Sequence, residues 1–316
     1  MSGNNLRMLP KVRDSWSYLY AERCRIDQDE KAIALHDQNG KTAVPCAAIN
    51  LLMLGPGTTI THAAIRTLAD SGCTVLWVGE GGVRLYAQGL GETRSAQRLL
   101  RQARLCSSPQ LRLQVVRRMY EYRFPEPLSA DLTLQQIRGK EGIRVREAYA
   151  KASRESGIAW HGRTYQRDDW KSADPVNRAL SAGNSCLYGI CHAAIVAAGY
   201  VPGLGFIHTG KLLSFVYDIA DLYKVEITIP AAFQAAKEGD EGLEGRVRRF
   251  CRDYFKDQRI LSRIVEDIDR ILAIGPLPED TPFDDDAAAP GDLWDGAWSS
   301  VAGGINQADV LVEDQR

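Results

Sequence analysis

The sequence lacks the features that would place it in a membrane or hold it together with disulfides. No stretch approaches the ~18 uninterrupted apolar residues of a membrane-spanning helix, and the N-terminal MSGNNLRMLPKVRD contains no apolar signal-peptide core. The seven cysteines are odd in number, and no two of them form a C-x-x-C pair. These absences argue against a disulfide framework and a cysteine zinc site. They predict a cytoplasmic protein with reduced thiols and no membrane partner.

Histidine is also scarce, with five in 316 residues. One of them, His208, lies ten residues before Asp218 and thirteen before Asp221. The apolar spacing predicts a helix over 212–223, which would place the two aspartates at i and i+3 on one face. Two carboxylates on one face repel each other unless a cation or a proton lies between them. The stretch indicates a metal site, and the alternative is a hydrogen-bonded structural histidine with two solvated aspartates.

Acidic residues are unevenly distributed. The segment 276–316 has ten acids and one base, so the net charge of −1 leaves +8 for the rest of the chain. Between residues 93 and 180, eighteen Lys or Arg stand against nine Asp or Glu. Such a surface attracts phosphate backbones, and Tyr165, Trp170 and Tyr188 in or beside it offer rings for stacking on unpaired bases. The alternatives are a solvated charge mixture with a solubilising tail, and ordinary packing of the aromatics.

The apolar period changes near residue 89. Before it, short β-branched and aromatic runs separated by Gly, Asn and Asp predict strands, with a hairpin at 38–40 and one helix over 61–71. After it the spacing is helical. The composition after residue 275, rich in Pro, Asp and Ala, is typical of a disordered segment. The chain is therefore predicted to be α+β.

Several helix boundaries can be predicted in the second part. Thr133 and Gln136 form a capping-box pattern, which predicts a short helix ending at Gly139 and a further helix over 141–156. Asp174-Pro175 is an N-cap and first-turn pair for a long helix to Ala198. That helix is crowded with small residues, so neighbouring helices can approach it closely.

One stretch has the order of a dinucleotide-binding unit. Leu51–Leu54, a Gly55-Pro56-Gly57-Thr58 turn, a helix and Val75–Val78 follow one another as strand, turn, helix and strand. The fingerprint fails because Ile60 stands where a third glycine is needed and proline occupies the tight turn. A structural turn is favoured over nucleotide binding.

Three motifs together resemble the CRISPR-associated integrase family Cas1. They are RGKEGIRVR at 138–146, DPVNRALSAGNSCLYG at 174–189 and GFIHTGKLLSFVYDIADL at 205–222. The turn at 55–58 and VLWVGE at 75–80 look like the version found in type I-E systems. The resemblance covers roughly residues 15–274. It implies an N-terminal β-sandwich domain over 1–90 and a larger all-helical catalytic domain over 91–275, and 276–316 is left as the acidic tail.

By this resemblance, Glu141, His208 and Asp221 hold a divalent metal, Mg²⁺ or Mn²⁺, and Asp218 supports them as a fourth catalytic residue. Read alone, Glu141 among four bases is a salt-bridged surface residue. Many relatives carry Glu where this chain has Asp221, which leaves direct or water-mediated binding open. The resemblance also implies five DNA contacts: Arg163, Tyr165, Tyr188, Lys211 and Lys224.

The resemblance implies a reaction and partners as well. Family members join the 3′-hydroxyl ends of a new spacer to a CRISPR repeat by transesterification, acting on double-stranded DNA. They work as homodimers, and two dimers flank a central Cas2 dimer in a heterohexamer. Two alternatives remain. One is a branched-DNA nuclease acting in DNA repair, and the other is a non-catalytic DNA-binding scaffold whose acidic residues only balance arginines.

Overall fold

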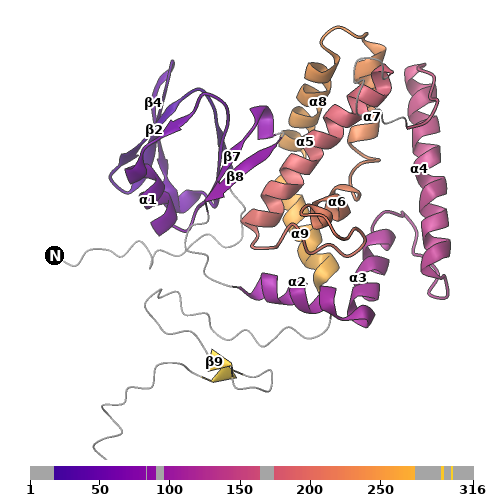
Figure 1. The fold of residues 1–316 in the computed structure, drawn as a ribbon. Coiled ribbons are helices and arrows are strands. Elements are labelled where there is room, and N and C mark those ends of the chain that lie inside the picture. The colour runs from indigo at the N-terminus through magenta and orange to yellow at the C-terminus, as the bar shows by residue number, and fades with distance from the viewer. Residues whose placement is uncertain are drawn as a thin grey trace, which may run out of the picture.

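The computed structural model describes residues 18–82, 84–89, 96–163 and 174–274, together with the backbone of two short strands in the C-terminal segment. Up to Gly89 the described chain forms strands and one α-helix, α1 (His62–Asp70), and from Gln97 to Leu272 it forms helices; the two groups of elements occupy separate parts of the molecule (Figure 1). The predicted α+β class is confirmed. The last strand of the first part ends at Gly89 and the first helix of the second begins at Gln97. The domain limits at 90 and 275 stay predictions.

The first part contains two four-stranded sheets. The first sheet has the order β1 (Tyr18–Ala21), β5 (Leu51–Leu54), β7 (Thr74–Val78) and β8 (Leu85–Gly89). The second has the order β4 (Gly40–Pro45), β3 (Ala32–Asp37), β2 (Arg25–Asp29) and β6 (Thr59–Ile60). The predicted hairpin is confirmed, because β3 and β4 pair antiparallel and Asp37 lies opposite Gly40.

The strand–turn–helix–strand pattern at 51–78 forms a real parallel crossover. β5 and β7 pair in parallel, and α1 (His62–Asp70) lies between them in sequence with Thr61 as its N-cap. The Gly55–Thr58 turn, however, leads into β6 of the other sheet and not into a helix N-terminus. Its backbone is tied to the β1–β2 connection, since Arg23 N donates to Pro56 O at 3.0 Å. The turn therefore has a structural use.

The inner strand β5 of the first sheet is buried on both faces. Leu52, Leu54 and Val75 pack in the cluster of the strand part, whereas Leu51 and Met53 join the main cluster of the helical part. Successive side chains of a strand point to opposite faces, so this division explains why all four residues of β5 are apolar and buried. The sheet thus connects the two cores.

Eight helices follow in the described part of the chain. They are α2 (Gln97–Ser107), α3 (Pro109–Glu121), α4 (Leu134–Ser156), α5 (Pro175–Ala197), α6 (Ser214–Ala220), α7 (Thr228–Lys237), α8 (Leu243–Asp257) and α9 (Ile260–Leu272). α5 lies in the middle of this group and packs against α6, α7, α8 and α9 (Figure 1). Its small residues permit this: a Cβ on Gly183 would stand 3.2 Å from Val247 and 3.4 Å from Thr228.

Helix α5 is long and apolar enough to cross a membrane by length and composition alone. In the structure, 72% of its most apolar window is buried against the rest of the protein. The same composition is expected of the central helix of a bundle, which is apolar on every side. Asp174 caps the helix and Pro175 occupies its first turn, as predicted.

The prediction of two helices on either side of Gly139 is wrong. The capping box of Thr133 and Gln136 is present, but α4 runs without a break from Leu134 to Ser156. Glycine inside a helix costs only about 1 kcal/mol relative to alanine, which one long helix tolerates. The helix ends at Gly157, which has the left-handed φ of 74°. Glu141 consequently lies inside a helix and not at the start of one.

The predicted helix over 212–223 is shorter than expected. α6 begins at Ser214, whose hydroxyl donates to Lys211 O at 2.8 Å, and its C-cap is Asp221. The two aspartates therefore do not occupy equivalent helical positions. In the C-terminal segment, β9 (Leu293–Trp294) and β10 (Ser300–Val301) pair antiparallel. The rest of the tail that was predicted to be disordered lies outside the described residues.

Candidate active site

The loop that carries His208 is anchored from two helices. Gln102 of α2 donates to Val201 O and Leu204 O, both at 3.0 Å. Arg112 of α3 donates to Gly205 O and Phe206 O at 3.2 and 2.8 Å. These contacts fix the backbone of the loop just before His208.

Gly205 is required where the loop passes closest to α6. A Cβ at this position would lie 2.7 Å from the Ser214 Cβ, a distance that real side chains do not tolerate. Any larger residue would push the loop away from α6 and move His208 with it.

Asp218 is the centre of this arrangement. Its side chain is fully buried, and Oδ2 accepts from Phe206 N at 2.6 Å and Ile207 N at 3.0 Å. Oδ1 accepts from His208 N at 2.8 Å and lies 2.7 Å from His208 Nδ1. A buried carboxylate needs several donors to offset its lost hydration, and the loop backbone supplies them. Asp218 therefore shapes the loop and orients the imidazole.

His208 faces solvent with the remaining part of its ring. Its side chain is 42% exposed. With Nδ1–H donating to Asp218, the lone pair of the imidazole lies on Nε2, the nitrogen that can bind a metal. The hydrogen bond with Asp218 raises the pKa of His208, and the charges of Asp218 and Asp221 act in the same direction against burial and Lys224.

Asp221 and Lys224 form an ion pair beside this histidine. The Lys224 Nζ lies 2.5 Å from Asp221 Oδ1 and 5.1 Å from the centre of the Tyr188 ring. Burial lowers the pKa of Lys224, but the Asp221 carboxylate and Tyr188 more than compensate, so the net shift is upward. Lys224 is therefore a permanent positive charge next to Asp221 at neutral pH.

Two tyrosines that the sequence reading missed complete the surroundings. Tyr217 packs edge-on between His208 and Tyr188, with ring centres 5.9 and 5.1 Å away. Tyr149 of α4 stacks on Trp160 with ring centres 4.4 Å apart. Burial raises the pKa of its hydroxyl, and the positive charges of Arg163 and Lys224 act against this. Tyr217 stands directly before Asp218 in the sequence, which is the only signal that could have found it.

Glu141 lies in a separate cluster of arginines. Arg144 donates to both of its oxygens, at 2.8 and 3.0 Å, and Arg123 donates to Oε1 at 3.3 Å. Within the described residues, no three His, Cys, Asp or Glu side chains are arranged to hold a metal ion. The structure thus brings His208, Asp218 and Asp221 together and pairs Glu141 with bases.

The predicted DNA-contacting residues have different surroundings. Arg163 is engaged in the fold, because it donates to Asn177 O at 2.8 Å and to Ser181 Oγ at 2.8 Å. Lys211 is exposed in the loop after His208, and Tyr188 is half-buried beside Lys224. Tyr165 lies outside the described residues.

Replacing Asp218 with alanine should destabilise the protein strongly. Three backbone N–H groups and the imidazole would lose their acceptor, at a cost of about 3 kcal/mol or more. Asp221→Ala is the matched control, because its side chain is 22% exposed and a partly exposed ion pair contributes about 1 kcal/mol or less. Urea unfolding of both variants measures the difference. Equal losses would show that Asp218 does not organise the loop.

Comparison with known proteins shows which family this chain belongs to. A family model described as CRISPR associated protein Cas1 matches residues 17–126 and 123–241. CRISPR-associated endonuclease Cas1 2 of Thermus thermophilus is 55% identical over 305 residues, covering 96% of this chain and 94% of the relative. CRISPR-associated endonuclease Cas1 of Escherichia coli is 42% identical over 275 residues, covering 87% and 90%.

Solved structures agree with these relatives. The crystal structure of a TtCas1–DNA complex matches with a TM-score of 0.79 at 56% identity, over 84% of this chain and 100% of that one. The Cas1 protein TM1797 of Thermotoga maritima shares the fold, with a TM-score of 0.52 at 14% identity over 82% and 96%. The family model and the relatives extend over both the strand part and the helical part. The chain therefore belongs to the Cas1 family of CRISPR-associated proteins.

Proposed function

We propose that this protein is a metal-dependent DNA endonuclease and integrase of CRISPR adaptation, which joins the 3′-hydroxyl ends of a new spacer to the repeat. The observation that carries the proposal is the orientation of His208 by buried Asp218, beside the Asp221–Lys224 pair. Relatives named endonucleases and a similar chain solved with DNA support the substrate class.

His208 and Asp221 have donor atoms that suit Mg²⁺ or Mn²⁺, since Mn²⁺ accepts imidazole and both ions prefer carboxylate oxygen. Glu141 is the proposed third ligand. It is mostly buried, at 14% exposure, and its negative charge is already balanced by Arg123 and Arg144. The bound ion would lower the pKa of the attacking hydroxyl and neutralise charge on the phosphate. Asp221 has a shorter side chain than glutamate, which favours contact through water.

The protein's own groups have separate tasks in the proposed reaction. A 3′-oxygen bonds to phosphorus, the bond to the leaving 3′-oxygen breaks, and the proton of the nucleophile is passed to that leaving oxygen, so one phosphodiester replaces another. Lys224 supplies a fixed positive charge for the phosphate. Asp218 holds the imidazole in one tautomer, and Tyr188 limits the movement of Lys224 through the contact at 5.1 Å.

The proposed partners follow from the same assignment. Double-stranded DNA, a second copy of the chain and a Cas2 dimer form the proposed heterohexamer in the cytoplasm. Lys211, Lys224, Tyr188 and Tyr165 are the proposed DNA contacts, and Arg163 contributes by holding the start of α5. The type I-E assignment is also proposed, and the turn at 55–58 and the segment 75–80 support it.

A strand-joining assay tests this function. Protein, Cas2 and duplex DNA with free 3′-hydroxyl ends are incubated with supercoiled repeat DNA and Mn²⁺, with and without EDTA. Joined product that disappears with EDTA is the expected result. Cutting without joining favours the branched-DNA nuclease, and binding without either reaction would leave the non-catalytic scaffold.

The joining rate should depend on the protonation of His208. Its pKa is raised above the ordinary value of about 6.5, and a protonated ring has no lone pair for a metal. At subsaturating Mn²⁺, the rate should therefore rise with pH through a midpoint above about 6.5. The pairing of protonated His208 with Asp218 contributes its full stability to the fold below the unfolded pKa of about 6.5. This contribution is lost as pH rises through the higher pKa of the folded state. An acid limb at or below the ordinary value contradicts the assignment.

A further inference from the structure

Asp267 is a buried carboxylate of α9 with no role in the proposed chemistry. Its side chain is 4% exposed, and its Oδ2 accepts hydrogen bonds from the hydroxyls of Tyr122 and Tyr223. Oδ1 accepts from Arg270 at 3.3 Å, and Arg263 Nε lies 3.7 Å from Oδ2. A buried charge with this many donors is fixed in position, so the two tyrosines are fixed with it.

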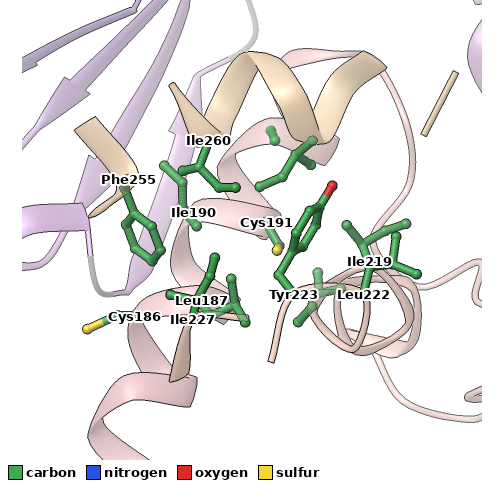
Figure 2. Packing of buried hydrophobic residues seen from close by; sticks show 14 of the residues in the cluster. Cys186, Leu187, Ile190, Cys191, Ile219, Leu222, Tyr223, Ile227, Phe255 and Ile260 are labelled. Carbon is green, nitrogen blue, oxygen red and sulfur yellow. The ribbon is translucent and has the colours of Figure 1, made fainter. Parts of the chain in front are cut away.

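One tyrosine belongs to the half of the candidate site that contains Asp221. Tyr223 stands between Asp221 and Lys224, is fully buried, and donates to Asp267 at 2.7 Å. Its ring packs in the main apolar cluster with Cys191 and Leu222 (Figure 2). Between α6 and α7 the backbone forms successive turns, in which Tyr223 N donates to Ala220 O at 3.0 Å and Ile227 N donates to Tyr223 O at 2.9 Å. The Tyr223 hydroxyl ties these turns to α9 and so helps to set where its neighbours lie.

The other tyrosine belongs to the half that contains Glu141. Tyr122 is the C-cap of α3, and the next residue, Arg123, donates to Glu141 from a guanidinium whose side chain is only 5% exposed. The rings of Tyr122 and Tyr223 also meet edge-on, with centres 6.5 Å apart. Asp267 therefore connects the backbone beside Asp221 with the backbone beside Glu141 through two hydroxyl groups.

Contacts other than these two hydroxyls also hold α9 in place. Arg118 of α3 donates to Ala273 O at 2.7 Å beyond the end of α9, and Ile264, Ile268 and Ile271 of α9 are buried in the main cluster. A second tyrosine–aspartate bond holds the same helix, since Tyr200 donates to Asp269 at 2.7 Å. Tyr200 lies just before the loop that carries His208, and its bond to Asp269 involves neither Tyr122 nor Tyr223.

We infer that Asp267 is a positioning residue that sets the spacing of the Glu141 half and the Asp221 half of the active site through Tyr122 and Tyr223. The inference rests on the proposed metal-dependent strand joining. A shift of about 1 Å in a reacting group can cost about a hundredfold in rate, and residues behind metal ligands typically contribute about 10–100-fold in affinity or activity.

The experiment compares Tyr223→Phe, Tyr122→Phe and Asp267→Asn with Tyr200→Phe. The phenylalanine variants each remove one hydroxyl and keep the ring, and Tyr200→Phe is the matched control because it breaks the same kind of bond to the same helix. Each variant is measured for its strand-joining rate, DNA affinity and melting temperature. Electron paramagnetic resonance measures Mn²⁺ binding to each variant in the absence of DNA. Tyr223→Phe and Asp267→Asn should lower the joining rate and weaken Mn²⁺ binding by about tenfold, with DNA affinity within twofold.

Tyr122→Phe should lower the joining rate and the Mn²⁺ affinity several-fold. Tyr200→Phe should leave the joining rate and the Mn²⁺ affinity within twofold of the wild type. The inference is overturned if the wild type joins DNA and the three variants match it, or if Tyr200→Phe loses as much as Tyr223→Phe, which would mean a general loosening of α9. A wild-type protein that neither joins nor cuts DNA overturns the proposed function instead, and the inference with it.

Discussion

His208→Ala is expected to abolish strand joining, with a loss of at least about a hundredfold, while the dissociation constant for DNA stays within a few-fold. The imidazole is a proposed metal-binding group, and buried Asp218 holds it at 2.7 Å. Phosphate affinity, by contrast, comes from lysine and arginine charges that this substitution leaves in place. Single-turnover joining with Mn²⁺ and a fluorescence anisotropy titration of the same duplex measure the two quantities.

His36→Ala is the matched control. His36 lies on β3 in the strand part, its side chain is 42% exposed like that of His208, and its Nε2 is 3.7 Å from Asp27. Removing it changes the same side chain at equal exposure and should leave the joining rate within twofold. If His208→Ala joins DNA as fast as His36→Ala, then His208 is a structural histidine and the metal-site assignment fails.

The spacing of the two aspartates predicted less about their surroundings than the structure shows. A spacing of three residues predicted that Asp218 and Asp221 share one helix face, and only the Cas1 resemblance gave Asp218 a supporting role. In the structure Asp218 is fully buried and binds the loop, whereas Asp221 ends the helix and pairs with Lys224. The difference arises from backbone N–H groups of Phe206 and Ile207, which attract the Asp218 carboxylate. Periodicity cannot reveal such contacts, because they depend on tertiary approach.

The same limit applies to the fold. Alternating strands, turn signals and helix caps were readable, because each depends on a few neighbouring residues. The parallel pairing of β1 with β5, and the placement of Gly55–Thr58 between two sheets, were not readable, since they join segments about thirty residues apart. Gly139 was misread as a helix end because a local cost was weighed without the packing of α4. Asp267 was missed because nothing near it in sequence marks a buried carboxylate.

Asp221→Asn should also abolish joining, by at least about a hundredfold, because a neutral amide cannot replace the carboxylate charge beside a divalent ion. The same change frees Lys224 from its partner at 2.5 Å. DNA affinity should therefore stay equal or increase, since one negative charge near the phosphate is removed. Joining assays and anisotropy titrations at two salt concentrations measure these opposite effects. Lost joining together with weaker DNA binding would point to a folding defect instead.

Two further variants test whether the charge or the position of the Asp221 carboxylate is required. Asp221→Glu keeps the charge and lengthens the side chain, so joining should stay within about tenfold of the wild type if the group reaches the ion. Asp29→Ala breaks a comparable ion pair in the strand part, where Lys41 Nζ lies 2.9 Å from Asp29, and should change nothing. A glutamate variant as inactive as the asparagine variant would mean that the position of this carboxylate matters as much as its charge. Full activity in the asparagine variant would remove Asp221 from the metal site.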